Sequence, residues 1–109
     1  MDSRKVFGNL GEDFASKFLE SKGHYILSRN YSSKWGEIDI ISLFQKELFF
    51  VEVKSRTSID MGYPAQSVDR RKLAKINRTA RDYLSKYSGR VNRWSFKIIE
   101  IYVNEIDRL

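Results

Sequence analysis

The first apolar pattern along the chain has the period of an α-helix. From Asn9 to Lys22, hydrophobic residues recur three or four positions apart, and Gly23 follows with the backbone freedom that helix ends often require. The apolar stripe of this helix consists of Leu10, Phe14 and Phe18, with Ala15 and Leu19 beside it. The pattern therefore predicts that one amphipathic helix opens the fold.

The rest of the chain alternates between strand and helix patterns. Strands are predicted at HYILSRNY, EIDIIS and ELFFVEVK, the last two in a hairpin-like arrangement around a polar FQK stretch. A long helix follows from Pro64, which the first turn of a helix tolerates, to about Tyr87. Its apolar face carries Val68, Ile76, Ala80, Tyr83, Leu84 and Tyr87. The last predicted strand is RWSFKIIEIYV, which alternates and is rich in β-branched residues.

The predicted order of helix, three strands, helix and strand describes a small α/β protein with a mixed central sheet flanked by helices. The three consecutive strands would form a meander, and the second helix would cross over to the last strand. The 109 residues include one Pro and no repeat or low-complexity run. We therefore expect residues 1–109 to form a single domain.

Composition limits the chemistry that this domain can perform. With no Cys and one His, the chain can form neither disulfides nor thiolate zinc sites, so carboxylates would have to hold any metal, which favours a hard cation. The net charge of +6 and the pI near 9.7 favour a polyanionic partner. Because we find neither an apolar stretch of about 20 residues nor a signal-peptide core, we expect a cytoplasmic location without a membrane partner.

Two charged residues interrupt the most apolar predicted strand, LFFVEVK. Side chains two positions apart in a strand point the same way, so Val51 and Val53 share one face and Glu52 and Lys54 share the other. Burying a charge without a partner costs several kcal/mol. These two charges therefore require an explanation.

The neighbouring predicted strand carries Asp39, with Ile38 and Ile40 expected on the opposite face. If the hairpin register places Asp39 beside Glu52, two carboxylates and the ammonium group of Lys54 share one patch. Such carboxylates repel each other unless a proton or a divalent cation lies between them. A bound cation would suit phosphodiester hydrolysis. The spacing alone is also compatible with a solvated cross-strand salt bridge, which is worth only about 0–1 kcal/mol.

Four motifs in order support the first interpretation. GEIDII followed by FFVEVKSR resembles the D…ExK core of the PD-(D/E)xK nuclease superfamily, without the Pro that names the motif. The wider set of GNLGEDFASKFLESKGHYILSRNY, GEIDIIS, FFVEVKSRT and GYPAQSVDRRK is similar to the YraN-like family, small and largely uncharacterised proteins thought to be endonucleases. That family in turn resembles the archaeal Holliday junction resolvases. The likeness spans about residues 8–87.

This resemblance implies a restriction-endonuclease-like core and a metal-dependent DNA endonuclease. It implies that Asp39 and Glu52 ligate Mg²⁺ or Mn²⁺, with the backbone carbonyl of Val53 as an additional ligand. It also implies that Lys54 is the catalytic lysine and Glu12 an auxiliary acid. Branched or otherwise irregular DNA would be the substrate, and a homodimer would provide two sites for paired cuts.

Glu12 has two interpretations in the sequence itself. It borders the apolar stripe of the first helix, so it could reach a site at the sheet. Alternatively, NLGE matches a capping box, with Asn9 as the N-cap and Glu12 three residues inside the helix.

Basic and aromatic residues provide the predicted contacts with DNA. Arg56 follows the ExK strand, and the polar face of the second helix carries Arg70, Arg71, Arg78 and Arg81. These arginines could contact phosphates, or they could form a solvated face with pairs such as Arg78–Asp82. Trp35 and Tyr63 could stack on unpaired bases or pack locally. Lys72 is predicted on the inward side of the helix, where it could also extend toward solvent.

One residue departs from the pattern of the resembling family, and two alternative functions stay open. Ser95 stands where the resembling family tends to have an acidic residue, which weakens the alignment of the last strand. A nuclease-like fold that binds nucleic acid without cutting it is the main alternative function. A membrane-surface module is the weaker one, because the apolar face of the second helix has no Trp or Phe.

Overall fold

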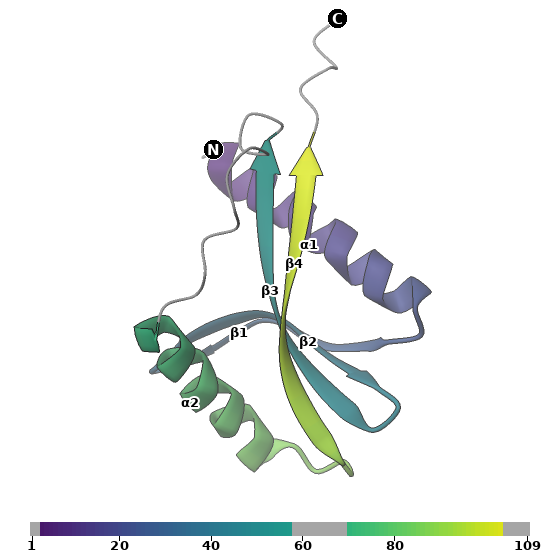
Figure 1. The fold of residues 1–109 in the computed structure, drawn as a ribbon, viewed down its shortest axis with the longest axis vertical. Coiled ribbons are helices and arrows are strands. Elements are labelled where there is room, and N and C mark those ends of the chain that lie inside the picture. The colour runs from purple at the N-terminus through teal and green to yellow at the C-terminus, as the bar shows by residue number, and fades with distance from the viewer. Residues whose placement is uncertain (1–2, 58–69, 104–109) are drawn as a thin grey trace, which may run out of the picture.

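A computed structural model describes residues 3–57 and 70–103, and Figure 1 shows the elements in the order expected from the sequence. They are α1 (Ser3–Ser21), β1 (Tyr25–Ser33), β2 (Gly36–Phe44), β3 (Glu47–Thr57), α2 (Arg70–Lys86) and β4 (Arg93–Val103). The strands form one sheet in the order β1-β2-β3-β4. The expected α/β class, with a mixed sheet flanked by two helices, is confirmed.

The strand pairing follows the chain. β1 pairs with β2 and β2 with β3 in antiparallel fashion, which confirms the meander. β3 and β4 run parallel, so the segment that contains α2 crosses over between them. The two helices cover opposite faces of the sheet, because neighbouring residues of β3 contact different helices: Phe50 belongs to the cluster on α2, and Val51 belongs to the cluster on α1.

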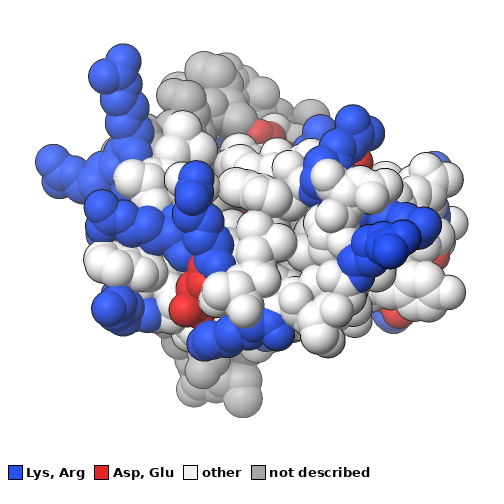
Figure 2. Space-filling view, turned by 90° about the horizontal axis from the view of Figure 1, so that it is seen from below, with Lys and Arg blue, Asp and Glu red and all other residues white. Residues whose placement is uncertain are grey.

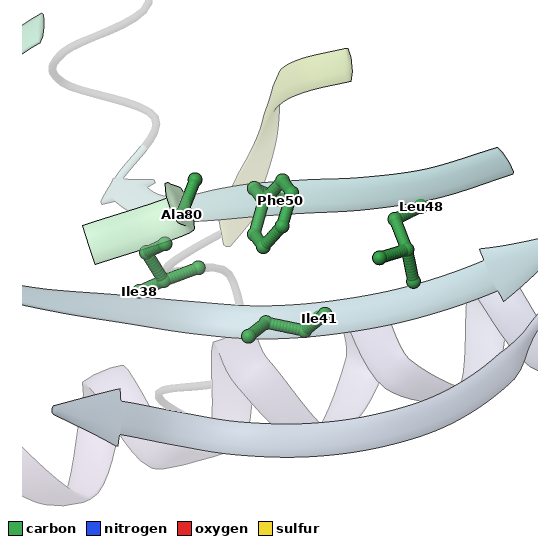
Figure 3. Close-up of a cluster of buried hydrophobic side chains, with 5 residues drawn as sticks. All are labelled: Ile38, Ile41, Leu48, Phe50 and Ala80. Carbon is green, nitrogen blue, oxygen red and sulfur yellow. The ribbon is translucent and has the colours of Figure 1, made fainter. Parts of the chain in front are cut away.

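The core consists of two apolar clusters, one on each face of the sheet. Figure 3 shows the cluster on the α2 side, formed by Ile38, Ile41, Leu48, Phe50 and Ala80. The cluster on the α1 side is formed by Ala15, Leu19, Ile40 and Val51. Most of the apolar face predicted for α2 packs here as expected, although Pro64 and Val68 lie outside the described residues. Neither described helix has the length and apolar character needed to cross a membrane.

The apolar stripe predicted for α1 is not its buried face. Leu10, Phe14 and Phe18 have exposed fractions of 53%, 65% and 53%, whereas Ala15 and Leu19 are buried. The helix thus packs through the residues that flank the predicted stripe.

Close packing of α1 against β3 explains this choice of face. A Cβ atom built on Gly11 would lie 2.0 Å from Oγ of Ser55 and 3.7 Å from Cγ1 of Val53. Gly11 and Ala15 therefore let the helix backbone approach the sheet, and bulky Phe side chains would not fit at that distance.

β2 also departs from the expected alternation. Ile38 and Ile40 were expected on one face, but Ile38 lies in the cluster on α2 and Ile40 in the cluster on α1. Asp39 lies between them, and the register leaves Asn30 of β1 opposite Asp39. Asn30 has a φ of 55°, in the left-handed region that Asn tolerates better than most residues. Asp39 thus lies at the point where the buried face of β2 changes, opposite the left-handed Asn30.

Candidate functional site

The hairpin register brings Asp39 and Glu52 to the same end of the β2–β3 ladder. The last ladder pair before this end joins Ile40 to Val51, so Asp39 and Glu52 are the next residues of their strands. The backbone N–H of Val53 donates a hydrogen bond to Oδ2 of Asp39 over 2.8 Å. The side chain of Asp39 therefore links β2 to β3 just beyond the last regular backbone pair.

Asp39 and Glu52 line one small cavity between the sheet and α2. Its volume is about 30 Å³, and its lining residues are Glu37, Ile38, Asp39, Val51, Glu52, Lys72, Ile76 and Phe96. A cavity of this size accommodates water or a small ion but no organic ligand. The polar groups on its wall, three carboxylates and one ammonium group, suit a cation.

The carboxyl group of Asp39 is in an unfavourable environment for a negative charge. Burial raises its pKa above the ordinary value of 3.8, and the nearby carboxylates of Glu12, Glu52 and Glu37 raise it further, while the hydrogen bond from Val53 lowers it. Three acidic side chains thus repel the carboxylate of Asp39. A proton or a cation at this position would relieve their repulsion.

Glu52 is held between two lysines. Its Oε1 atom lies 2.5 Å from Nζ of Lys72 in α2 and 4.0 Å from Nζ of Lys54, its neighbour on β3. Its Oε2 atom is buried and has no hydrogen-bond partner in the part of the chain that the structure describes. The sequence predicted that Lys72 lies on the inward side of the helix, but it did not identify Glu52 as its partner. That contact depends on how α2 crosses β3.

Glu12 lies well inside α1, so the capping-box interpretation is wrong. The helix begins at Ser3, which places Asn9 in its second turn. The Oε1 atom of Glu12 is buried, makes no hydrogen bond within the described residues, and lies 3.6 Å from Nη2 of Arg29. Nη1 of the same guanidinium group is 2.8 Å from Oδ1 of Asp13. Sequence reasoning missed Arg29, since no local motif indicates a contact between β1 and α1.

The acidic side chains do not form a complete metal site as they stand. Among residues 3–57 and 70–103, no three His, Asp or Glu side chains come together as a group that could hold a metal ion. Asp39 and Glu52 share a cavity, while Glu12 approaches Arg29. The ligand set of Asp39, Glu52 and the Val53 carbonyl stays a prediction.

The predicted DNA-contacting arginines of α2 are all exposed, namely Arg70, Arg71, Arg78 and Arg81. Figure 2 shows Lys and Arg side chains crowded on the side of the molecule where α2 lies. The proposed Arg78–Asp82 pair is wrong: Asp82 pairs with Lys86 at 3.3 Å, and Arg78 lies over the ring of Trp35. Arg56 is half-buried, and its Nε atom has no hydrogen-bond partner among the described groups.

Ser95 makes a structural contact at the β3–β4 pairing. Its hydroxyl donates a hydrogen bond to Oε2 of Glu47, while Nε of Arg93 lies 2.8 Å from Oε1 of the same carboxylate. Both contacts lower the pKa of Glu47. An acidic residue at position 95 would repel Glu47, so the departure from the family pattern fits this local pairing.

These features define the protein as a small mixed α/β domain with an acidic cavity between its sheet and a basic helix. Residues 11–101 match the model of the "Uncharacterised protein family UPF0102". The chain therefore belongs to this family.

Curated relatives cover almost the whole chain. A UPF0102 protein of Caldanaerobacter subterraneus subsp. tengcongensis is 40% identical over 102 residues, which cover 94% of this chain and 84% of the relative. One from Clostridioides difficile is 44% identical over 103 residues, 94% of this chain and 90% of the relative. One from Dictyoglomus thermophilum is 38% identical over 107 residues, which cover 98% of this chain and 91% of the relative.

Proposed function

We propose that this protein is a metal-dependent endonuclease that hydrolyses phosphodiester bonds in DNA. The observation that carries the proposal is the shared position of Asp39 and Glu52 at one ladder end, in a cavity of about 30 Å³. Lys54, the third residue of the D…ExK pattern, lies 4.0 Å from Glu52. Branched or otherwise irregular DNA is the substrate class suggested by the likeness to resolvases.

The residues of this cavity fit a hard divalent cation. The buried Oε2 atom of Glu52 lacks a partner among the described residues, and partial burial, with a further contribution from neighbouring carboxylates, raises the pKa of Asp39. Asp39, Glu52 and the carbonyl of Val53 would hold Mg²⁺ or Mn²⁺. Such an ion supplies Lewis acidity, which activates water and stabilises charge on phosphate oxygens.

The side chains around the cavity have separate roles in this proposal. The ammonium group of Lys54 orients the attacking water or neutralises the charge that develops on the phosphate. Lys72 and a bound cation would compete for the same carboxylate of Glu52. Lys72 would therefore lower the affinity of the site for the cation. Glu12, kept near the cluster by Arg29, adds to the negative potential that attracts the cation.

The exposed arginines of α2 would bind the DNA backbone. Guanidinium groups contact phosphates without reading sequence, and binding of this kind weakens steeply as salt increases. Arg56 would add a further phosphate contact at the end of β3. We therefore expect recognition of DNA structure more than of base sequence.

A cleavage panel tests the enzymatic proposal. Labelled duplex, single-stranded, flap and four-way-junction DNAs are incubated with Mg²⁺, Mn²⁺ or EDTA, using the wild type, Glu52→Gln and Lys54→Met. Glu20→Gln and Lys17→Met carry the same chemical changes at exposed positions of α1 and serve as matched controls. We expect metal-dependent cutting that Glu52→Gln and Lys54→Met abolish and the controls retain. Equal cutting by all five folded proteins would refute the assignment.

A second function, DNA binding without catalysis, is favoured by the close pairing of Lys72 with Glu52 and by the incomplete group of acids in the described chain. Salt-sensitive DNA binding by the wild type, with no cutting of any substrate in either metal, would select it. The homodimer and the cytoplasmic location stay predictions, and sedimentation analysis would test the first.

A further inference from the structure

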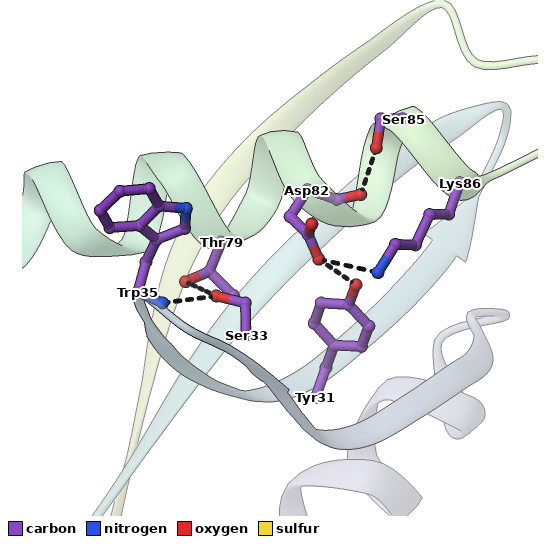
Figure 4. A network of polar contacts seen from close by, with 7 residues as sticks. All are labelled: Tyr31, Ser33, Trp35, Thr79, Asp82, Ser85 and Lys86. Carbon is purple, nitrogen blue, oxygen red and sulfur yellow. Dashed lines mark hydrogen bonds and ion pairs between the residues drawn. The ribbon is translucent and has the colours of Figure 1, made fainter.

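The tip of the β1–β2 hairpin is attached to α2 by a chain of hydrogen bonds, shown in Figure 4. The N–H of Trp35 donates to Oγ of Ser33 over 3.0 Å, and the hydroxyls of Ser33 and Thr79 are 3.0 Å apart. The buried Thr79 hydroxyl donates to the carbonyl of Lys75 over 2.9 Å. Because each hydroxyl has one proton, Ser33 must donate to Thr79. Every group in the chain is then satisfied.

A second contact fixes the hairpin one turn further along α2. The hydroxyl of Tyr31 donates to Oδ2 of Asp82 over 2.5 Å, and Nζ of Lys86 lies 3.3 Å from the same oxygen. The ring of Tyr31 also packs edge-on against Tyr83, with centroids 5.1 Å apart. Polar and aromatic contacts made by residues other than the Trp35 side chain therefore hold the hairpin on the helix.

Two cations lie over the indole ring of Trp35, which stays partly exposed. Its residue is 38% exposed. The guanidinium carbon of Arg78 lies 4.6 Å from the ring centroid, and Nζ of Lys34 lies 5.0 Å from it. A partly exposed aromatic ring on an anchored hairpin, with positive charges in contact with it, is an arrangement by which proteins stack nucleobases and neutralise their phosphates.

We propose that Trp35, Lys34 and Arg78 form a platform on which an unpaired base of DNA stacks. The exposed arginines of α2 hold the flanking phosphates, so the platform and the helix bind one continuous strand. Bases inside a duplex are already paired and stacked, and they offer no free face to the indole. The platform therefore selects single-stranded segments and the open bases of branched DNA. This inference rests on the proposed DNA binding and is independent of cleavage.

The test is fluorescence anisotropy with a labelled oligothymidylate and a labelled duplex of equal length, in EDTA so that no cutting occurs. Trp35→Ala should weaken single-strand binding by about 5- to 150-fold, the range observed for one stacked base, and change duplex binding less than about twofold. Trp35→Phe should retain most of the affinity because it keeps a ring. Tyr25→Ala removes an aromatic residue that is 73% exposed at the start of β1, and it should bind like the wild type.

Intrinsic fluorescence gives a second readout. The chain has two Trp residues, and Trp94 packs edge-on against Phe50 with centroids 5.4 Å apart. Oligothymidylate should quench the wild type and leave Trp35→Phe unquenched. An equal loss for both DNAs in Trp35→Ala, no loss for either, or a wild type that binds no DNA would each overturn the platform. Single-strand binding through Trp35 in a protein that cuts nothing would keep the platform and refute the endonuclease proposal.

Discussion

Replacing Asp39 by Asn is expected to stabilise the fold at neutral pH and to remove the predicted metal ligand. The half-buried carboxylate interacts with Glu12, Glu52 and Glu37, and partial burial together with these charges raises its pKa. An amide has nearly the same shape and keeps an oxygen that can accept the hydrogen bond from the Val53 N–H. The substitution thus removes the repulsion and leaves the contact.

The size of the effect follows from what the substitution relieves. A single stabilising substitution commonly raises the stability of a protein by about 0.5–2 kcal/mol. We expect about 1 kcal/mol for Asp39→Asn, or a melting temperature higher by roughly 4–8 °C for a domain of this size. The change also removes one negative charge from a chain whose net charge is +6, which by itself would slightly disfavour the compact state. A gain would therefore be a local effect of the site.

The gain must depend on pH in a defined direction. Because the pKa of Asp39 is raised above its ordinary value of 3.8, the folded protein binds this proton more tightly than the unfolded chain. The contribution of Asp39 to wild-type stability therefore falls as the pH rises from its ordinary pKa through its raised pKa. Above the raised pKa this contribution is constant. The advantage of Asp39→Asn is absent well below the ordinary pKa, grows through this window and is complete above the raised pKa.

Thermal and urea unfolding across this pH range measure the effect. Glu20→Gln removes an exposed carboxylate from α1, and its stability should match the wild type at every pH. In a parallel series, Mn²⁺ should raise the melting temperature of the wild type and leave that of Asp39→Asn unchanged. A variant less stable than the wild type at neutral pH, or an advantage that does not change with pH, would refute the charge-crowding explanation.

Three further predictions concern packing and charge. Lys72→Met removes the ammonium group 2.5 Å from Glu52 and should tighten Mn²⁺ binding up to about fivefold in calorimetry, whereas weaker binding would contradict competition. The change that Gly11→Ala makes in the free energy of unfolding should be more favourable by about 1 kcal/mol in a Ser55→Ala background than in the wild type. Equal changes in the two backgrounds, measured by urea unfolding, would argue against close contact between positions 11 and 55. Phe14→Ser, at a residue 65% exposed, should change the free energy of unfolding by less than about 0.5 kcal/mol in the same assay, and a larger loss would mean that the ring is buried.

The order of elements was predictable because each pattern depends on neighbouring residues alone. Period, turn residues and β-branching identified two helices and four strands, and the apolar face of α2 was correct at Ile76 and Ala80. The juxtaposition of Asp39 and Glu52 depended on one hairpin register, and a short loop leaves few registers open.

The rest depended on contacts between distant segments. The period of α1 shows an apolar stripe, but the helix packs through Gly11 and Ala15 because small residues permit a close approach to β3. The change of buried face between Ile38 and Ile40 coincides with the left-handed backbone of Asn30, which lies opposite in another strand. No pattern within one segment contains that information.

The charges at the ladder end are only partly compensated, and this bears directly on why they are there. One oxygen of Glu52 and one of Glu12 are buried without a hydrogen bond among the described residues, and the pKa of Asp39 is raised. Apolar residues at these positions would give a more stable strand, because buried ion pairs rarely stabilise more than well-packed hydrophobic side chains do. Strain of this kind collects at functional sites. Partial compensation of this kind is what the proposed cation site predicts, and the ion pairs with Lys72 and Lys54 account for the contacts of one Glu52 oxygen only.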